Sequence, residues 1–383
     1  MNLAELIRGA DQKMAMRDFQ GAATLLEQAA QLQPEDLGLW MRIAAMRRAA
    51  SQPRRALEAV HKALALNPRD FTALLLRASL LQKLDDPDAG EAWGHALAQK
   101  PGTAVPEALK PVIAEAERCY AAWQSEQQSR LLESIAPAEA KADEEQRKRM
   151  ERFCSNTVRR TRPYHSSPTH YHYPELAERE FHPRRLFPWL ERLEAATEII
   201  AAELRNVMAA ERAELVPYVQ YDEHVPMDQW RPLNQNPDWT AIHLLLKGER
   251  IEPNARHCPE TMALLAELDQ PVIAGASPNA MFSLLAPRTL IPPHVGINNA
   301  RLVCHLPLIV PEGCWFRVGA ETRYWKRGEA FVFDDTIEHE AKNPSDELRV
   351  VFIFDIWHPD LSAPERDAVA ALIGSVGTRG EAL

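Results

Sequence analysis

Two patterns of polar and apolar positions divide the chain of 383 residues. In the first hundred residues, alanine and proline positions recur in three similar segments, AATLLEQAAQLQPED, ALEAVHKALALNPRD and AGEAWGHALAQKPGT. From residue 239 onward, short apolar runs rich in β-branched and aromatic residues alternate with turn residues. The first pattern predicts paired helices, and the second predicts strands.

The N-terminal segments form a repeat with a period near 34 residues. Small alanines allow helices to approach closely, and a proline ends one unit so that the next can begin. Asp36 and Asp70 follow two of these prolines and can cap the helices that start there. The markers that recur in register are Pro34, Pro68 and Pro101, Ala22, Ala56 and Ala89, and Ala29, Ala63 and Ala96.

This period resembles the tetratricopeptide repeat, over roughly residues 3 to 120, with pairs of antiparallel helices. Such a stack binds an extended peptide or a partner protein in its concave face. The alternative is that it only dimerises the protein or supports the second domain, and the sequence leaves both readings open.

A connector and an arm follow the repeats. Residues 121–152 are rich in Glu, Gln, Ala, Lys and Arg, which predicts a helical connector that Pro137 interrupts. The next segment, CSNTVRRTRPYHSSPTHYHYPEL, is rich in arginine and proline and predicts an irregular arm laid across the second domain.

Three histidines in the arm raise the question of a metal cluster. His170 and His172 would share one face of a strand, and His165 lies nearby. Neighbouring Cys154 and Glu175 lie at no known ligand spacing, so an aromatic, proline-rich packing arm is favoured.

After a helical stretch at residues 187–210, the apolar runs predict a β domain. Strands of this length and spacing indicate a sandwich or barrel with a jelly-roll-like topology. Near the C-terminus, Ser362 and Glu365 form a capping pair for a last helix. The runs are WTAIHLLLKG, AMFSLLAP, ARLVCHLPLIV, CWFRVG, AFVFDD and LRVVFIFDIW.

Composition limits the classes of function. The net charge is −10, which argues against a general nucleic-acid binder. The N-terminus has no apolar core of signal-peptide length, and no run is long enough to span a bilayer. Five widely spaced cysteines without a CxxC pair suggest neither a disulfide framework nor a zinc site. We therefore expect a cytoplasmic protein.

The segment from Pro293 to Pro359 carries the candidate chemistry. His294 lies at the mouth of a strand, His339 follows 45 residues later, and Arg349 opens the last long strand. Two neutral imidazoles suit ferrous iron, to which the usual non-haem site adds a carboxylate. The expected position of that carboxylate, two residues after His294, is occupied by Gly296, so the site would have two protein ligands.

The C-terminal half resembles the aspartyl/asparaginyl β-hydroxylase family of iron- and 2-oxoglutarate-dependent oxygenases, over roughly residues 155–365. The resemblance includes the absence of the triad carboxylate, which Gly296 matches. The segments that carry it are the FS of AMFSLLAP, PHVGINNARLVCHL, FDDTIEHE and LRVVFIFDIWHPDL.

The resemblance implies a role for each matching residue. His294 and His339 match the iron ligands, and Arg349 matches the arginine that pairs with the distal carboxylate of 2-oxoglutarate. Ser283 and His305 match positions that help to hold this cosubstrate.

Asp335 and Val303 bear on the surroundings of the metal and on the choice of substrate. Asp335 is expected to orient iron-bound water or a ligand imidazole. Family members that act on epidermal-growth-factor-like domains carry an arginine where this chain has Val303, and Arg301 matches a different family arginine. The substrate is therefore left open.

The implied fold class is a multidomain α+β chain, with tetratricopeptide-like helical repeats followed by a double-stranded β-helix (jelly-roll) oxygenase domain. The expected boundaries are 1–120 for the repeats, 121–176 for the connector and arm, 177–365 for the oxygenase domain, and 366–383 for a C-terminal helix and tail.

The implied activity uses Fe(II), O2 and 2-oxoglutarate, which is converted to succinate and carbon dioxide. Its leading form is hydroxylation of an Asp or Asn side chain in a peptide or protein presented with help from the repeats. A lipid hydroxylase of the lipid A type and a catalytically silent, repeat-based scaffold are the alternatives. No nucleic acid or membrane span is expected.

Overall fold

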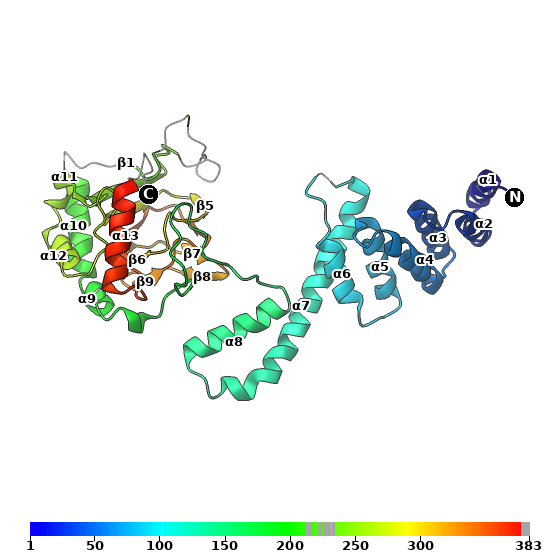
Figure 1. Cartoon of the computed structure of the whole chain (residues 1–383), viewed down its shortest axis with the longest axis horizontal. Helices are drawn as coiled ribbons and strands as arrows, with labels where there is room; N and C mark the ends of the chain where they lie inside the picture. The colour runs from blue at the N-terminus through cyan, green and yellow to red at the C-terminus, as the bar shows by residue number, and fades with distance from the viewer. Residues whose placement is uncertain (104, 211–215, 221–223, 225–230, 232–233, 377–383) are drawn as a thin grey trace. The chain divides into compact units, whose positions relative to one another are not determined.

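The computed structural model describes residues 1–103, 105–210, 216–220, 224, 231 and 234–376. The chain divides into two compact units, residues 1–161 and 162–383 (Figure 1). Each unit has hydrophobic clusters of its own. The last residues of the predicted tail, 377–383, lie outside the described residues.

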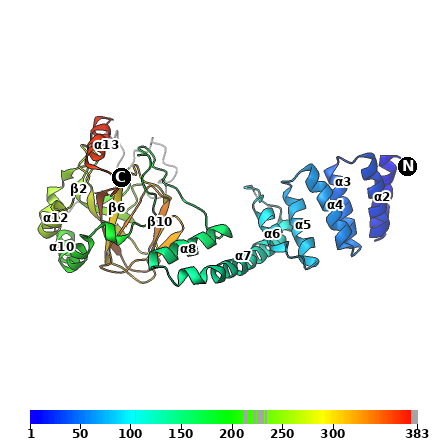
Figure 2. The same cartoon turned by 60° about the horizontal axis from the view of Figure 1, so that its bottom comes forward.

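The first unit begins with a stack of paired helices, which confirms the predicted repeat. The alanines of the repeat lie where the helices touch, and Ala22, Ala56 and Ala63 are completely buried. Asp36 and Asp70 cap helices as predicted, since each accepts a hydrogen bond from the amide three residues later. The helices, seen side by side in Figure 2, are α1 (Leu3–Ala15), α2 (Phe19–Leu32), α3 (Leu37–Ala49), α4 (Pro53–Leu66), α5 (Phe71–Lys83) and α6 (Ala89–Leu97).

A long helix, α7 (Lys110–Glu139), and a shorter one, α8 (Glu144–Thr157), complete this unit after a short 3-10 turn, η1 (Glu107–Leu109). The predicted interruption at Pro137 is wrong by a few residues, because α7 runs through Pro137 and ends at Glu139. Asp143 and Gln146 then form a capping box that starts α8.

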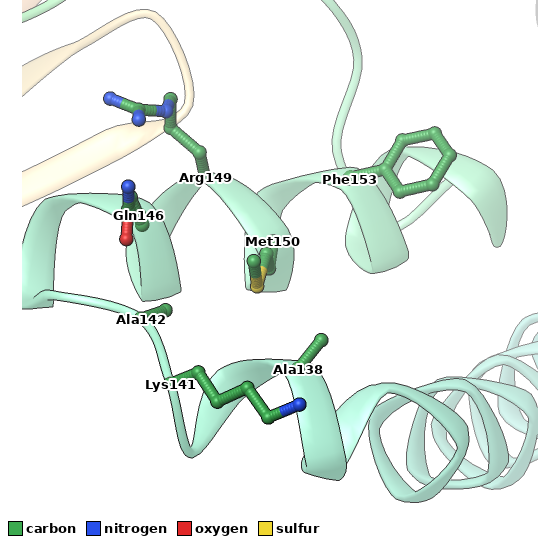
Figure 3. Close-up of a pocket in the computed structure, with 7 residues that line it drawn as sticks. All are labelled: Ala138, Lys141, Ala142, Gln146, Arg149, Met150 and Phe153. Carbon is green, nitrogen blue, oxygen red and sulfur yellow. The ribbon is translucent and has the colours of Figure 1, made fainter.

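A pocket opens between the end of α7 and α8 (Figure 3). It contains no histidine, cysteine or carboxylate, so it offers neither a metal site nor an acid–base pair. Its lining residues are Ala138, Lys141, Ala142, Gln146, Arg149, Met150 and Phe153.

The second unit begins with the arm, which is irregular as predicted from residue 162 onward, whereas the predicted start of the arm at Cys154 is wrong because residues 154–157 form the last turn of α8. Near the C-terminus, the backbone amide and the hydroxyl of Ser362 both donate to Glu365, which confirms the predicted capping pair. The helices are η2 (Arg184–Leu186), α9 (Leu190–Ala195), α10 (Thr197–Ala209), α11 (Glu252–Ala255), α12 (Pro259–Ala266) and α13 (Ala363–Val376).

Two antiparallel sheets form the body of the second unit. The larger has the order β1-β2-β4-β11-β6-β9, with β3 paired to β2, and the smaller has the order β5-β10-β7-β8. The strands are β1 (Val216–Pro217), β2 (Trp239–Leu246), β3 (Glu249–Arg250), β4 (Ala280–Leu285), β5 (Leu290–His294), β6 (Arg301–Ile309), β7 (Trp315–Val318), β8 (Glu321–Tyr324), β9 (Phe331–Phe333), β10 (His339–Lys342) and β11 (Arg349–Trp357).

This order confirms the expected fold class. Strands β4 to β11 are shared between the sheets as in a double-stranded β-helix: β4, β11, β6 and β9 lie in one sheet and β5, β10, β7 and β8 in the other. The chain thus joins a helical-repeat stack to a two-sheet domain.

The two faces of β11 show where the candidate site lies. Phe352 and Phe354 point to the outer face of the larger sheet, where they pack in one cluster with Leu204 of α10. Val351 and Ile353 point the other way, into a cluster between the sheets. Because side chains alternate along a strand, Arg349 shares this inner face.

Candidate functional site

The two predicted metal-binding histidines lie side by side. His294 ends β5 and His339 begins β10, and the two are direct partners in the antiparallel pairing of these strands. Their ring centroids are 4.0 Å apart, and both side chains are buried. The fold therefore joins two residues that are 45 positions apart in the sequence.

Backbone carbonyls fix the tautomer of both rings. Nδ1 of His294 lies 2.8 Å from the carbonyl of Pro292, and Nδ1 of His339 lies 3.1 Å from that of Ile337. A carbonyl can only accept, so each Nδ1 carries the hydrogen and the lone pair lies on Nε2. This is the arrangement in which a neutral imidazole binds a metal ion.

Burial also keeps the two rings neutral. It lowers the pKa of His294 to about 4. Burial, and next the neighbouring His294, hold the pKa of His339 well below its usual range. At neutral pH both rings therefore offer lone pairs rather than positive charges.

Asp335 occupies the space that a side chain at position 296 would need. A Cβ built on Gly296 would lie 2.3 Å from Oδ2 of Asp335, too close for any side chain to fit without movement. The amide of Gly296 also donates to the carbonyl of Asp335 at 2.7 Å. A larger residue at position 296 would therefore have to displace the Asp335 carboxylate, independently of metal chemistry.

A buried ion-pair network holds the Asp335 carboxylate. Arg301 donates to Oδ2 of Asp335 at 3.0 Å and to Oδ1 of Asp355 at 2.9 Å. Burial raises the pKa of Asp335 although Arg301 favours its charged form. Oδ1 of Asp335 is buried and has no hydrogen-bond partner in the described structure. That oxygen could accept a hydrogen bond from a bound water or ligand.

Asp355 was not predicted from the sequence as part of the site. Its second oxygen accepts hydrogen bonds from Ser277 and from the amide of Asn279, which anchors the network to the larger sheet. The sequence does contain a signal for it. Asp355 is the one polar residue among the positions that follow Arg349 in β11, which are otherwise apolar.

Arg349 carries a buried charge without a carboxylate partner in the described part of the chain. Its side chain is 1% exposed, and its Nε has no hydrogen-bond partner. The guanidinium lies 4.7 Å from the centroid of the Trp325 ring. Burial lowers its pKa to about 10. A buried cation of this kind is suited to an anionic ligand.

His305 lies on the same inner face and faces aromatic rings. Its centroid is 5.0 Å from that of Phe316 and 4.8 Å from that of Phe333, and both of these rings also contact His339. Burial, and next Arg349, lower the pKa of His305 well below its usual range. Its Nδ1 has no partner among the described atoms. His305 is therefore a neutral group with an unused ring nitrogen.

Ser283 is linked to the histidine pair through an aromatic stack. Its hydroxyl accepts a hydrogen bond of 3.0 Å from the indole of Trp239, whose ring lies 6.2 Å from His294. Tyr218 stacks on Trp239 with a centroid distance of 3.9 Å. Neither Trp239 nor Tyr218 was selected from the sequence, because a lone aromatic residue in a strand usually belongs to the core.

The arm histidines and Val303 are the remaining positions singled out in the sequence. His165 is exposed and lies 2.9 Å from Glu178, and His172 is exposed. No three His, Cys, Asp or Glu side chains among the described residues form a group that could hold a metal ion. Val303 is buried between the sheets, paired in register with Asp355 and Phe333. No helix in the described ranges is long and apolar enough to cross a membrane.

Comparison with known proteins confirms the family resemblance for the second unit. Residues 194–359 match the family model of the aspartyl/asparaginyl beta-hydroxylases. This range includes the histidine pair, Arg349 and the other predicted site residues.

Two human proteins illustrate the similarity and its extent. The chain is 38% identical over 145 residues to aspartate beta-hydroxylase domain-containing protein 2. This alignment covers 37% of this chain and 39% of that protein. It is 35% identical over 142 residues to aspartyl/asparaginyl beta-hydroxylase, covering 37% of this chain and 18% of that protein. The match thus spans less than two fifths of either relative.

Among solved structures, the chain is similar to the tetratricopeptide-repeat domain of Sgt2 from Aspergillus fumigatus. The identity is 21%, the TM-score is 0.27, and the match covers 30% of this chain and 77% of that one. The assignment of helical repeats to this protein rests on its own helix pairs and their spacing.

Proposed function

We propose, from the premise that the second unit belongs to the aspartyl/asparaginyl beta-hydroxylase family, that this protein is an Fe(II)- and 2-oxoglutarate-dependent dioxygenase. Its reaction would hydroxylate the β-carbon of an Asp or Asn side chain in a peptide or protein. The observation that carries the proposal is the pairing of His294 with His339 on the sheet interior that also holds the buried guanidinium of Arg349, which has no carboxylate partner among the described residues.

The histidine pair fits a ferrous ion. Both rings are neutral and present Nε2, and position 296, where other non-haem sites carry the third protein ligand, is a glycine. A ferrous ion held there with 2-oxoglutarate would supply the oxidising power to insert one atom of O2 into a C–H bond, with succinate and carbon dioxide as coproducts.

Arg349 would bind the distal carboxylate of 2-oxoglutarate. Its guanidinium is held over the ring of Trp325, which limits its motion, and it has two or more donors for a carboxylate. An ion pair between Arg349 and this carboxylate would also offset the buried positive charge. Binding of 2-oxoglutarate should therefore raise the stability of the folded protein.

Ser283 and His305 would orient the same cosubstrate. Because the Ser283 hydroxyl already accepts from Trp239, its own hydrogen is available to donate to a carboxylate oxygen. The unused Nδ1 of His305 gives a second polar contact in an otherwise aromatic wall.

Asp335 would orient a water molecule next to the metal. Its Oδ1 is an unused acceptor, and Arg301 fixes the direction of the carboxylate. Such a water would stand in for the carboxylate that other non-haem sites supply.

Succinate release from 2-oxoglutarate is the direct test. We expect release that depends on added Fe(II) and is lost in His339→Ala, while the variant keeps the melting temperature of the wild type within a few degrees. Equal release by wild type and His339→Ala would contradict the assignment. A folded wild type that releases no succinate would leave the repeat-based scaffold as the better description.

Mass spectrometry would identify the substrate class. Cell extracts treated with wild type or with His339→Ala should differ in peptides that gain one oxygen on Asp or Asn. A gain of oxygen on an acyl chain instead would favour the lipid hydroxylase.

A further inference from the structure

Residues 166–171 of the arm lie along the loop that follows His294. The amide of Thr169 donates to the carbonyl of Gly296 at 3.0 Å. The amide of Tyr171 donates to the carbonyl of Ile297, also at 3.0 Å. The arm therefore adds backbone hydrogen bonds to the segment directly after one histidine of the pair.

The same short stretch is bonded to the loop that precedes His339. The amide of Ser167 donates to the carbonyl of Thr336 at 2.9 Å. The hydroxyls of Ser166 and Thr336 are buried and lie 2.7 Å apart. Because the Thr336 hydroxyl donates to Asp334 at 2.5 Å, Ser166 must donate to Thr336. This gives an ordered chain of hydrogen bonds from the arm into the loop.

A third contact connects the two loops directly. The amide of Gly296 donates to the carbonyl of Asp335 at 2.7 Å. The arm, the loop after His294 and the loop before His339 are thus joined pairwise. A shift of the arm would release hydrogen bonds to both loops at once.

The arm is itself anchored beyond this contact. Tyr173 and Asn299 exchange hydrogen bonds of 2.6 and 2.9 Å, and the Tyr173 hydroxyl donates to Glu365 of α13 at 2.9 Å. Tyr171 and Tyr173 also pack against the cluster that contains Ile373 of α13. These contacts give the arm a fixed position against which the loops can be held.

We propose that residues 166–171 act as a clasp that sets the separation of His294 and His339 and thereby the affinity of the pair for a divalent metal ion. This rests on the proposed function in so far as the histidines bind a metal. Ser166 is a positioning residue here, because its hydroxyl bonds to Thr336 and acts on the histidines through the loop before His339.

The test compares adjacent serines in the full-length protein. Ser166 is buried and bonded to Thr336, whereas Ser167 is exposed and uses its backbone amide. We expect Ser166→Ala to weaken Co²⁺ binding about 10-fold, in the range known for residues that support metal ligands. Ser167→Ala should bind Co²⁺ within twofold of the wild type. The visible absorption bands of bound Co²⁺ should change in Ser166→Ala alone, since they report ligand geometry.

A pair of variants at Thr336 separates positioning from folding. Thr336→Val keeps the shape but loses the hydroxyl, and should weaken Co²⁺ binding at least as much as Ser166→Ala. Thr336→Ser keeps the hydroxyl and should restore wild-type affinity. Melting temperatures recorded without metal show how much of each effect is general destabilisation.

The same Co²⁺ measurements distinguish a failure of the clasp from a failure of the metal site. Unchanged Co²⁺ affinity and absorption bands in both Ser166→Ala and Thr336→Val would overturn the clasp while leaving the metal site in place. Equal Co²⁺ affinity in wild type and His339→Ala would remove the metal site itself, and with it the proposed function.

Discussion

Arg349 is a buried cation that no carboxylate offsets in the described structure, and this gives it a testable signature. Replacing it by Met removes the cost of burying the charge, so the ligand-free protein should be as stable as the wild type or more stable. The 2-oxoglutarate concentration for half-maximal succinate release should rise by roughly 30-fold or more, equivalent to about 2 kcal/mol. The assay is succinate formation together with melting curves.

The exposed Arg288, which pairs with Asp346, offers a matched control. Arg288→Met should change neither the cosubstrate requirement nor the melting temperature appreciably, because exposed pairs contribute little. An Arg349→Met protein with an unchanged requirement for 2-oxoglutarate would contradict the role assigned to the guanidinium.

His182 predicts a pH dependence of stability that is separate from the site. It is buried, neither ring nitrogen has a partner among the described residues, and burial lowers its pKa from 6.5 to about 3. Between these values the unfolded chain binds a proton that the folded protein does not, so stability falls as pH falls from about 6.5. At pH 5 the resulting loss in the free energy of unfolding is about 2 kcal/mol.

His182→Leu should remove this dependence. The melting temperature of the second unit should exceed that of the wild type by about 5 °C more at pH 5 than at pH 7.5. His172→Leu, at an exposed position, is the control and should show no such gain. A difference that stays constant between the two pH values would show that His182 does not titrate in the way its burial implies.

At the scale of elements, the loop after β5 is constrained by the loop before β10. Gly296→Ala would push the Asp335 carboxylate away from Arg301, because the new Cβ would lie 2.3 Å from Oδ2. Disturbing a buried ion pair should cost about 3 kcal/mol. In an Asp335→Ala background the same change should cost much less, since the obstruction is gone. Denaturant unfolding of the four proteins measures the coupling.

Gly374 in α13 provides the control for this experiment. A Cβ at Gly374 would make ordinary contacts, the nearest at 3.6 Å, so Gly374→Ala should stabilise the helix by up to about 1 kcal/mol. If Gly296→Ala were equally harmless, Asp335 would not be packed against Gly296.

The elements differ in how far the sequence predicts them. Apolar runs predict β2, β4, β6, β7, β9 and β11, and the structure confirms each. The sequence does not predict β5, because it contains Pro292 and Pro293, which disfavour a strand. Both prolines are tolerated because β5 is an edge strand of the smaller sheet. β8 and β10 carry charges at alternate positions and are too short to give a clear pattern.

The histidine pair and Arg349 were selected from their residue types together with the family resemblance, and their roles stay predictions. The partners that orient these groups depend on tertiary contacts. Asp355 is 54 positions from Arg301, and Ser166 is 170 positions from Thr336. No local pattern reports such contacts, so the ion-pair network and the clasp required the fold.

For the whole molecule, hydrophobic clustering suggests where the repeats can be separated from the rest. Every residue assigned to the two helical clusters of the first unit lies at or before Tyr120. Removing residues 1–120 therefore eliminates these clusters together rather than cutting through one of them. The second unit keeps its own clusters.

This truncation tests whether the repeats present a substrate. Because the histidine pair and Arg349 lie in the second unit, substrate-independent succinate release should stay within about twofold of the full chain. If the repeats hold the peptide, oxygen incorporation into substrate proteins should fall about 10-fold or more through a higher KM, since a tethered site raises the local substrate concentration. Unchanged incorporation would assign the repeats to another partner or to assembly. Loss of both activities would instead mean that the second unit depends on the first for its fold, which melting curves of the truncated protein would reveal.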